Sequence, residues 1–221
     1  MKVILIHGFH RSPRDMRTLK NNLQLLGYEC YAPKFPLTFN EFDQSVSQLE
    51  NFFATLPLEK GEKVHLVGHS TGGLLIRKFL EETKFIDRIG RAVLIACPNH
   101  GSRFVDIIHQ FKFWTKIYKT LHSLRTDYVK QLKLMENYPT EIAAIAGTKN
   151  SIILRNIINE ENDGRIEVSS VYFSGLTDFA TLPYGHKEIH HKIETVQLVD
   201  HFLRMGKFEK KDSKQLELQN T

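Results

Sequence analysis

The serine at position 70 is the residue whose surroundings in the sequence best suit it to act as a nucleophile. It follows an aliphatic run and precedes a segment with helical character, within Gly68-His69-Ser70-Thr71-Gly72-Gly73. A turn from strand to helix this tight strains the central residue, and side chains two positions away would collide. The flanking glycines therefore predict a hydroxyl at the carboxyl end of a strand, beside free N–H groups that suit a developing oxyanion. The alternative is a glycine-rich turn that only packs a helix on a sheet.

A serine hydroxyl needs a base within hydrogen-bond reach, and eleven histidines could supply it. His186 lies in a loop between a short predicted strand and the closing helix, and Gly185 makes such a loop easy to form. His190 and His191 remain alternatives, although they begin the predicted helix. The other candidates lie within predicted strands, helices or the turn at Ser70, and core or surface positions explain them more simply: His65, His69, His109, His122 and His201. Of these, His69 is expected to point away from Ser70, because side chains alternate along a strand.

The base in turn needs a carboxylate that fixes its tautomer and stabilises the imidazolium. Asp163 follows the predicted strand over residues 141–146, after an intervening segment, and Gly164 marks a turn there. Turn formation alone would also explain this segment. Asp178 is the rival, because it is nearer to His186 in the chain. We favour Asp163.

The elements that must position these residues alternate along most of the chain. Strands are expected over residues 2–7, 28–32, 63–68, 91–96, 141–146 and 179–183. Helices are expected over residues 13–26, 41–56, 71–82 and 189–204, the first with Ser12 as its N-cap and Pro13 at its first position. Residues 3–6 and 92–95 are unbroken aliphatic runs, as in strands covered on both faces. The chain is therefore predicted to be of the α/β class, with a doubly wound, mostly parallel sheet and helices on both faces.

Several segments resemble the α/β-hydrolase superfamily, particularly its small bacterial serine esterases and lipases. Besides the turn at Ser70, the resemblance rests on four segments in the order of that family: Ile6-His7-Gly8-Phe9, Pro98-Asn99-His100-Gly101-Ser102, Asn162-Asp163-Gly164 and Leu182-Pro183-Tyr184-Gly185-His186. These matches extend from residue 3 to about residue 205.

The resemblance implies a serine hydrolase that cleaves small carboxylic esters through an acyl-enzyme, without a cofactor or a metal ion. The catalytic triad would be Ser70, Asp163 and His186, and the backbone N–H groups of Phe9 and Thr71 would form the oxyanion hole. A thioesterase or an acyltransferase would use the same triad. A protein that kept the fold and lost catalysis would be a binding protein, so these alternatives stay open.

A long, mainly helical stretch over residues 103–135 interrupts the alternation and is rich in aromatic and basic side chains. In this fold such an insert usually lies over the active site, as a cap that lines an acyl pocket. A helix pair packed on the body and a surface in weak contact with a membrane interface are the alternatives. We expect one hydrolase domain over residues 1–205 and a charged, frayed tail over residues 206–221.

Composition and charge disfavour other classes of protein. The net charge is +5 over 221 residues, but no basic run accompanies a nucleic-acid-binding motif, so no nucleic-acid partner is expected. The first apolar run is too short for a signal peptide, and no stretch approaches the ~20 apolar residues that span a bilayer. This favours the cytoplasm, and with it a carboxylesterase acting on short or medium acyl chains over a lipase acting on aggregated fat.

The chain has two cysteines, Cys30 and Cys97. In the sheet order of the family they would lie on strands three places apart, which is roughly 14 Å at ~4.8 Å per strand. This separation is too large for a disulfide, so both thiols are expected to be free.

Overall fold

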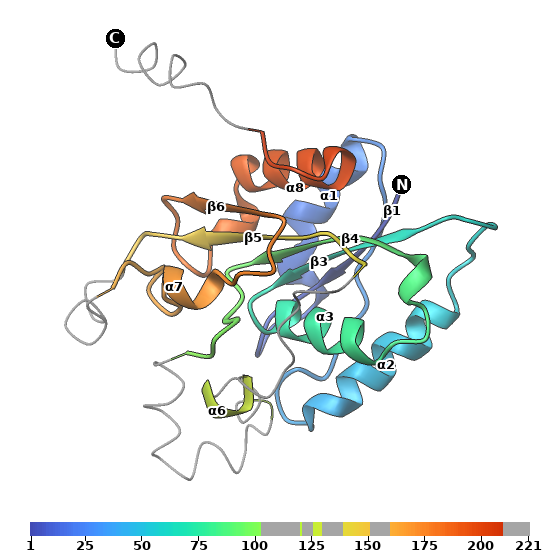
Figure 1. The fold of residues 1–221 in the computed structure, drawn as a ribbon, viewed down its shortest axis with the longest axis horizontal. Helices are drawn as coiled ribbons and strands as arrows, with labels where there is room; N and C mark the ends of the chain where they lie inside the picture. The colour runs from blue at the N-terminus through green and yellow to red at the C-terminus, as the bar shows by residue number, and fades with distance from the viewer. Residues whose placement is uncertain (103–119, 121–125, 130–138, 151–159, 210–221) are drawn as a thin grey trace.

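A parallel sheet forms the centre of the computed structural model, which describes residues 1–102, 120, 126–129, 139–150 and 160–209 (Figure 1). Its six strands lie in the order β2-β1-β3-β4-β5-β6, and each is parallel to its neighbours. The strands are β1 (Lys2–Ile6), β2 (Glu29–Tyr31), β3 (Val64–His69), β4 (Ile89–Ile95), β5 (Ile142–Gly147) and β6 (Asp178–Leu182). Because the chain winds outward from β1 in both directions, the predicted doubly wound α/β sheet is confirmed.

Helices cover both faces of the sheet (Figure 1). On one face lie α1 (Arg17–Leu25) and α8 (Ile193–Met205), and on the other lie α2 (Phe42–Ala54), α3 (Thr71–Glu82) and the short α7 (Val168–Val171). The alternation of side chains along β1 divides the core between the two faces. Ile4 and Ile6 belong to the cluster with α2 and α3, whereas Val3 and Leu5 belong to the cluster with α1 and α8. All four are fully buried, which explains why the strand has an unbroken aliphatic sequence.

Two helices that the sequence predicts as continuous are each divided in the structure. The first begins as a 3-10 turn, η1 (Pro13–Met16), with Ser12 at its N-cap position and Pro13 at its start as predicted, although the Ser12 side chain makes no capping hydrogen bond. The closing helix is divided into the 3-10 turn η4 (Ile189–His191) and α8, with extended backbone at Lys192 between them. The Thr195 hydroxyl donates to the Ile189 carbonyl at 2.6 Å and stabilises this break. The remaining short helices of the described residues are η2 (Ile86–Arg88) and α6 (Thr126–Val129).

Most of the predicted helical insert, residues 103–135, lies outside the described residues, and only residue 120 and α6 fall within it. Of the predicted tail, residues 210–221 also lie outside the described residues. Its described beginning is not frayed, because Phe208 is buried against Phe202 with 5.5 Å between the ring centroids. Within the described part of the chain, every helix is too short or too polar to cross a bilayer.

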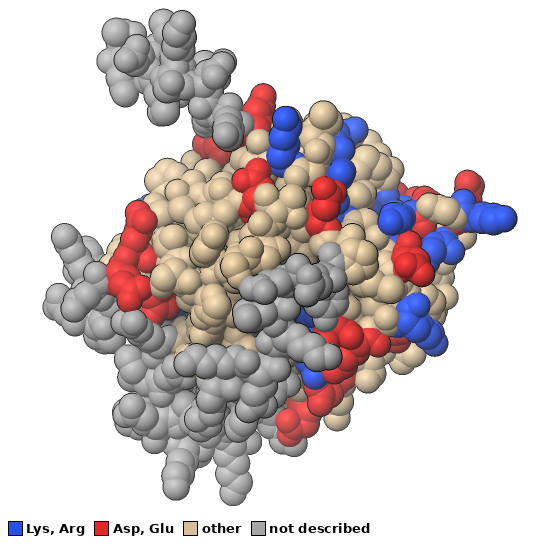
Figure 2. All heavy atoms as spheres, viewed as in Figure 1, with Lys and Arg blue, Asp and Glu red and all other residues tan. Residues whose placement is uncertain are grey.

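Acidic and basic side chains are interspersed on the face of the molecule shown in Figure 2. In the described part of the chain as a whole, ion pairs join opposite charges, such as Lys2 with Glu62 at 2.8 Å and Lys78 with Glu82 at 2.7 Å. The positive net charge of the sequence therefore does not form one continuous basic patch among the described residues on this face.

Both cysteines are free and buried, as the sequence predicts. Cys30 lies on β2 and Cys97 follows β4, and the strands β1 and β3 separate them. Burial raises the pKa of the Cys30 thiol to about 11 and that of the Cys97 thiol to about 12. The thiolate, which is the reactive form, is therefore a very small fraction of either group at neutral pH.

We accordingly expect both thiols of the native protein to react slowly with Ellman's reagent at pH 8. In guanidinium chloride, which unfolds the chain and restores ordinary thiol pKa values, two equivalents should react within the mixing time. The absorbance of the released thionitrobenzoate measures both rates. A thiol that reacts in the native protein as fast as in the denatured one would contradict the burial of these residues.

Candidate active site

The turn at Ser70 joins β3 directly to α3, with no residue between strand and helix other than the serine itself. Ser70 has φ 55° and ψ −123°, a backbone conformation that residues with side chains rarely adopt. Its N–H donates to the Ile95 carbonyl at 2.8 Å, which fixes the serine to the end of β4. The strained turn predicted from the sequence is therefore present.

The glycines on either side of Ser70 permit this turn to pack closely. A Cβ atom at position 72 would lie 2.4 Å from the Ile6 carbonyl oxygen, and a Cβ atom at position 68 would lie 2.6 Å from the backbone of Gly72. Both clashes involve main-chain atoms, so the start of α3 would have to move to relieve them. The collisions expected from the sequence occur at both positions.

Replacing Gly72 with alanine is therefore expected to lower the free energy of unfolding by about 3 kcal/mol or more. Gly185→Ala provides a control, since a Cβ there would have its nearest neighbour at 3.5 Å. It should cost less than about 1 kcal/mol. Urea denaturation, monitored by circular dichroism, measures both free energies of unfolding. Equal stabilities of the two variants would contradict the close packing of Gly72 against β1.

His186 connects Ser70 and Asp163 through its two ring nitrogens. Nε2 lies 3.0 Å from Ser70 Oγ, and Nδ1 lies 2.7 Å from Asp163 Oδ2. An ionised carboxylate can only accept hydrogen bonds, so Nδ1 carries the proton and Nε2 is free to accept one from the serine hydroxyl. All three residues are buried, which keeps these contacts largely out of water.

The turn that contains Asp163 fixes the orientation of its carboxylate. Oδ1 accepts the N–H groups of Arg165 and Ile166 at 3.0 and 2.8 Å, while Oδ2 faces the imidazole. The main chains are joined as well, because the His186 N–H donates to the Asp163 carbonyl at 2.8 Å. The segment around Asp163 thus forms the turn that its sequence suggests, and the same turn places a carboxylate beside a histidine.

Parallel strands bring these three residues to one edge of the sheet. Ser70 directly follows β3, Asp163 lies beyond β5, and His186 lies in the loop after β6. Since all the strands run in the same direction, the segments beyond their carboxyl ends meet at the same edge. The sequence alone did not fix the neighbours of β6, so the meeting of His186 with Ser70 depends on the sheet order.

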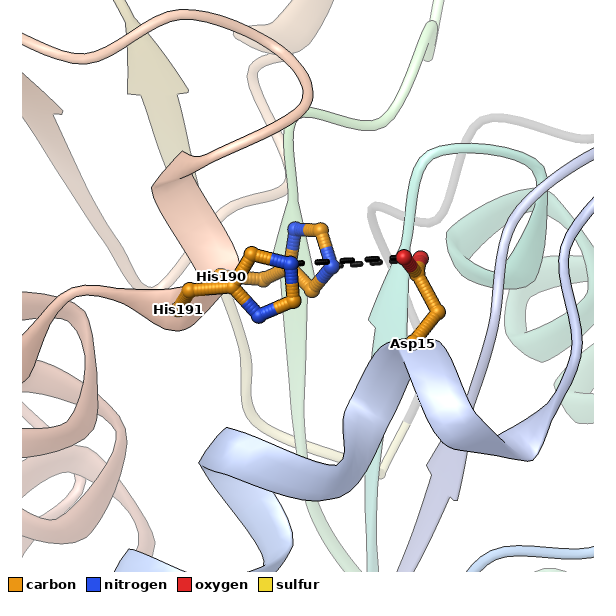
Figure 3. A group of neighbouring side chains, drawn as sticks. All are labelled: Asp15, His190 and His191. Carbon is orange, nitrogen blue, oxygen red and sulfur yellow. Dashed lines mark ion pairs between the residues drawn. The ribbon is translucent and has the colours of Figure 1, made fainter.

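The alternative base and acid residues lie elsewhere. Asp178 begins β6, at the opposite end of the strand from the His186 loop, and its carboxylate accepts the N–H groups of Phe179 and Phe208 at 2.8 and 2.7 Å. His190 and His191 face Asp15 (Figure 3). The remaining described candidates have other partners: His65 accepts the Arg91 N–H, and His201 contacts the Lys207 carbonyl. His109 and His122 lie outside the described residues.

The loop after β1, which contains Phe9, lies against the serine. A Cβ atom at Gly8 would be 3.1 Å from Ser70 Cβ. His7 fixes this loop, since its Nδ1 contacts the Gly8 carbonyl at 3.0 Å and its Nε2 accepts the Phe35 N–H at 3.2 Å. Burial lowers the pKa of His7, which favours the neutral tautomer that these two contacts require. Phe9 and Thr71 therefore belong to the two segments that flank Ser70.

His69 supports the loop that carries His186, a role that was not predicted from the sequence. His69 Nε2 lies 2.9 Å from the His186 carbonyl oxygen and donates to it. Burial holds the pKa of His69 well below its usual value, so this imidazole is neutral. Its position next to Ser70 was the available signal, but the contact spans 117 residues and no local pattern predicts it.

A second missed support is the pair formed by Arg77 and Asn99 behind the turn. Arg77 Nη1 donates to the Asn99 carbonyl at 2.7 Å, and Asn99 Nδ2 donates to the Val171 carbonyl at 2.6 Å. Nearby, Ser102 Oγ donates to the Arg165 carbonyl at 3.2 Å. The segment from Asn99 to Ser102 thus ties α3 to the turn that holds Asp163. An arginine directly after the apolar run Leu74-Leu75-Ile76 was the signal for this buried pair.

Comparisons with known proteins agree with the fold. A family model described as the Alpha/beta hydrolase family matches residues 3–144, which include Ser70 but neither Asp163 nor His186. The solved structure of the Bacillus licheniformis lipase BlEst2 in its mature form has a TM-score of 0.75 at 18% identity, over 92% of this chain and 91% of that chain. A search of the curated proteins gave no match.

Two further solved structures share the fold at lower coverage. A metagenomic carboxyl esterase has a TM-score of 0.69 at 14% identity, over 86% of this chain and 65% of that chain. The phospholipase PlaB from Legionella pneumophila has a TM-score of 0.63 at 16% identity, over 78% of this chain and 46% of that chain. At sequence identities this low, these solved structures show only that the present chain shares their fold.

Proposed function

Because this chain belongs to the alpha/beta hydrolase family, we propose that it is a serine hydrolase that cleaves carboxylic esters. In this proposal Ser70 is the nucleophile, His186 is the base, and Asp163 is the carboxylate partner of His186. The observation that carries the proposal is the continuous path of contacts from Ser70 Oγ to His186 Nε2 at 3.0 Å and from His186 Nδ1 to Asp163 Oδ2 at 2.7 Å. Solved structures with the names lipase and carboxyl esterase share the fold and support ester chemistry.

In the first half of the reaction, Ser70 Oγ attacks the carbonyl carbon of the ester while His186 Nε2 takes the hydroxyl proton. The resulting imidazolium is stabilised by the Asp163 carboxylate, which remains ionised. When the tetrahedral intermediate collapses, the bond to the leaving alcohol breaks and His186 returns the proton to that oxygen. An acyl group is then bound to Ser70.

In the second half, a water molecule replaces the alcohol. His186 takes a proton from this water as it attacks the acyl carbon, and the bond to Ser70 Oγ breaks in the next step. The serine regains its proton from the imidazolium and the carboxylic acid leaves. One histidine can serve both halves because its neutral form, with the proton on Nδ1, is restored after each.

The negative charge on the carbonyl oxygen must be stabilised in both tetrahedral intermediates. We assign this role to the backbone N–H groups of Phe9 and Thr71. Thr71 is the first residue of α3, and the first N–H groups of a helix have no partner inside it. The partial positive charge of the helix N-terminus acts in the same direction. Since main-chain groups perform this role, the two side chains are free to vary.

A fluorophosphonate probe and a panel of substrates test the proposal. The wild-type protein should form a covalent adduct that peptide mapping places on Ser70, and Ser70→Ala should form none. Ser47→Ala is a control, because this serine lies on the exposed side of α2 and should not affect labelling. Acyl nitrophenyl esters with chains of two to twelve carbons should be hydrolysed, and their kcat/KM values would give the chain-length preference.

Matched thioesters and added alcohols distinguish the competing chemistries. Higher kcat/KM for thioesters than for esters of the same acyl group would indicate a thioesterase, and transfer of the acyl group to an added alcohol in preference to water would indicate an acyltransferase. A folded protein that neither reacts with the probe nor hydrolyses any member of the panel would overturn the proposal in favour of a binding protein.

A further inference from the structure

A second cluster of titratable side chains lies behind the active site and has no part in the proposed reaction. It consists of Asp15 from η1, His190 and His191 from η4, and His69 from the end of β3. We call it the histidine cluster. His190 Nε2 lies 3.2 Å from Asp15 Oδ2, and His191 Nε2 lies 4.0 Å from Asp15 Oδ1 (Figure 3). The three ligand atoms that Asp15, His190 and His191 can offer all lie within 4.8 Å of one another.

Most polar atoms of this cluster are buried without a hydrogen-bond partner among the described residues. They are Asp15 Oδ2, His69 Nδ1, both ring nitrogens of His190, and His191 Nδ1. His190 is only 1% exposed, and its short approach to Asp15 lacks the alignment of a hydrogen bond. Buried polar groups in folded proteins are normally satisfied, so these atoms need an explanation. The rest of the site does not provide one.

From these contacts we infer that Asp15, His190 and His191 bind a divalent transition-metal ion of the zinc type. Two imidazole nitrogens and one carboxylate oxygen form a ligand set that zinc prefers. In a tetrahedral site with bonds of 2.0–2.1 Å, ligand atoms lie about 3.3 Å apart. The observed separations of 3.2 and 4.0 Å approach this value, so small side-chain rotations bring the three groups to one ion.

The surroundings of the cluster suit such an ion. The His191 side chain is 35% exposed and that of Asp15 is 14% exposed, which leaves a route for an ion from solvent. The deeper side is closed by His69, whose ring stacks on that of His190 with 3.8 Å between centroids and whose Nδ1 lies 3.8 Å from Asp15 Oδ2. His69 is therefore the candidate for a fourth protein ligand.

An ion at this site would also stabilise the loop that carries His186. It would join residue 15 to residues 190 and 191, which are far apart in the sequence but packed together in the fold. Because the unfolded chain does not bring these residues together, binding of the ion would favour the folded state. His190 is only four residues from His186, and His69 holds the His186 carbonyl at 2.9 Å. The ion therefore has a positioning role, whereas the chemistry of ester cleavage does not pass through it.

Titration of the chelator-treated, dialysed full chain with zinc sulfate tests this inference by calorimetry and by thermal unfolding. The wild type should bind one ion at the cluster with a rise in Tm. His191→Gln and Asp15→Asn should each weaken binding at least about 100-fold and abolish the rise, because each removes a direct ligand. His191→Gln is the safer variant for folding, since its side chain is partly exposed. The Tm in chelator verifies that each variant is folded.

Two controls separate the cluster from other zinc-binding groups. Asp163→Asn removes the carboxylate beside His186, and His201→Gln removes a partly exposed histidine of α8; both should bind zinc as the wild type does. The inference is wrong if the wild type binds no zinc or shows no rise in Tm. It is also wrong if folded His191→Gln and Asp15→Asn proteins bind zinc normally, or if either control variant loses the ion. Fluorophosphonate labelling of the wild-type protein is a separate measurement, so failure of the zinc inference and failure of the proposed hydrolase function can be distinguished.

Discussion

Ser70→Ala, His186→Ala and the variant with both substitutions are each expected to lower kcat for ester hydrolysis by on the order of 10⁶-fold. The two side chains act as one unit, because the hydroxyl is activated only when its proton can pass to His186 Nε2, 3.0 Å away. Removal of either group therefore removes the whole nucleophilic pathway. The second substitution in the double variant then has nothing further to remove, so the losses do not multiply.

Steady-state kinetics with the best nitrophenyl ester of the panel measures this non-additivity. His201→Gln and Ser47→Ala are controls that replace a histidine and a serine outside the site, and they should retain wild-type kcat. Circular dichroism verifies that all variants are folded. Single variants with small losses that multiply in the double variant would show that Ser70 and His186 act independently, and this result would exclude the proposed mechanism.

Asp163→Asn is expected to lower kcat by about 10⁴-fold, whereas Asp178→Asn should leave it within about twofold of the wild type. Asp163 Oδ1 accepts two backbone N–H groups, so the amide oxygen of an asparagine must occupy that position. Its NH₂ group then faces His186 Nδ1, which must give up its proton to accept a hydrogen bond. The imidazole is left with its proton on Nε2, where it cannot accept the proton of Ser70.

The comparison between these two asparagine variants uses the same ester and includes the Tm of each protein. Asp178 accepts the Phe208 N–H at 2.7 Å, so its replacement can lower Tm without lowering kcat. A large loss of kcat in the Asp178→Asn protein, together with unchanged turnover in the Asp163→Asn protein, would reverse the assignment of the acid.

The sheet was predictable because its central strands are covered on both faces. Residues 3–6 and 92–95 are continuous aliphatic runs for that reason, and the structure buries them all. The turn at Ser70 was also predictable, since the clash that a side chain at position 68 would make is with Gly72, across the two successive elements β3 and α3. Such features are local or depend on burial alone.

Other features depend on contacts between distant segments, and local patterns did not predict them. The expected helix over residues 189–204 is broken at Lys192, and the resulting 3-10 turn directs His190 toward Asp15, 175 positions earlier in the chain. Helical periodicity does not indicate this break, because His190 would fit a continuous α-helix as well as the 3-10 turn. The placement of Asp163 near His186 was expected only from the order of segments in a resembling family, and their catalytic roles stay predictions.

The sheet order has a consequence for how the protein is made. Ser70 follows a central strand, but His186 follows β6, the strand at one edge and the last of the sheet in the chain. During synthesis, N-terminal segments are available to fold first. Under the proposed mechanism, Ser70 has no base until residue 186 has left the ribosome and β6 has paired with β5. A nascent chain that lacks β6 and the loop after it is therefore inert toward acyl compounds under this mechanism.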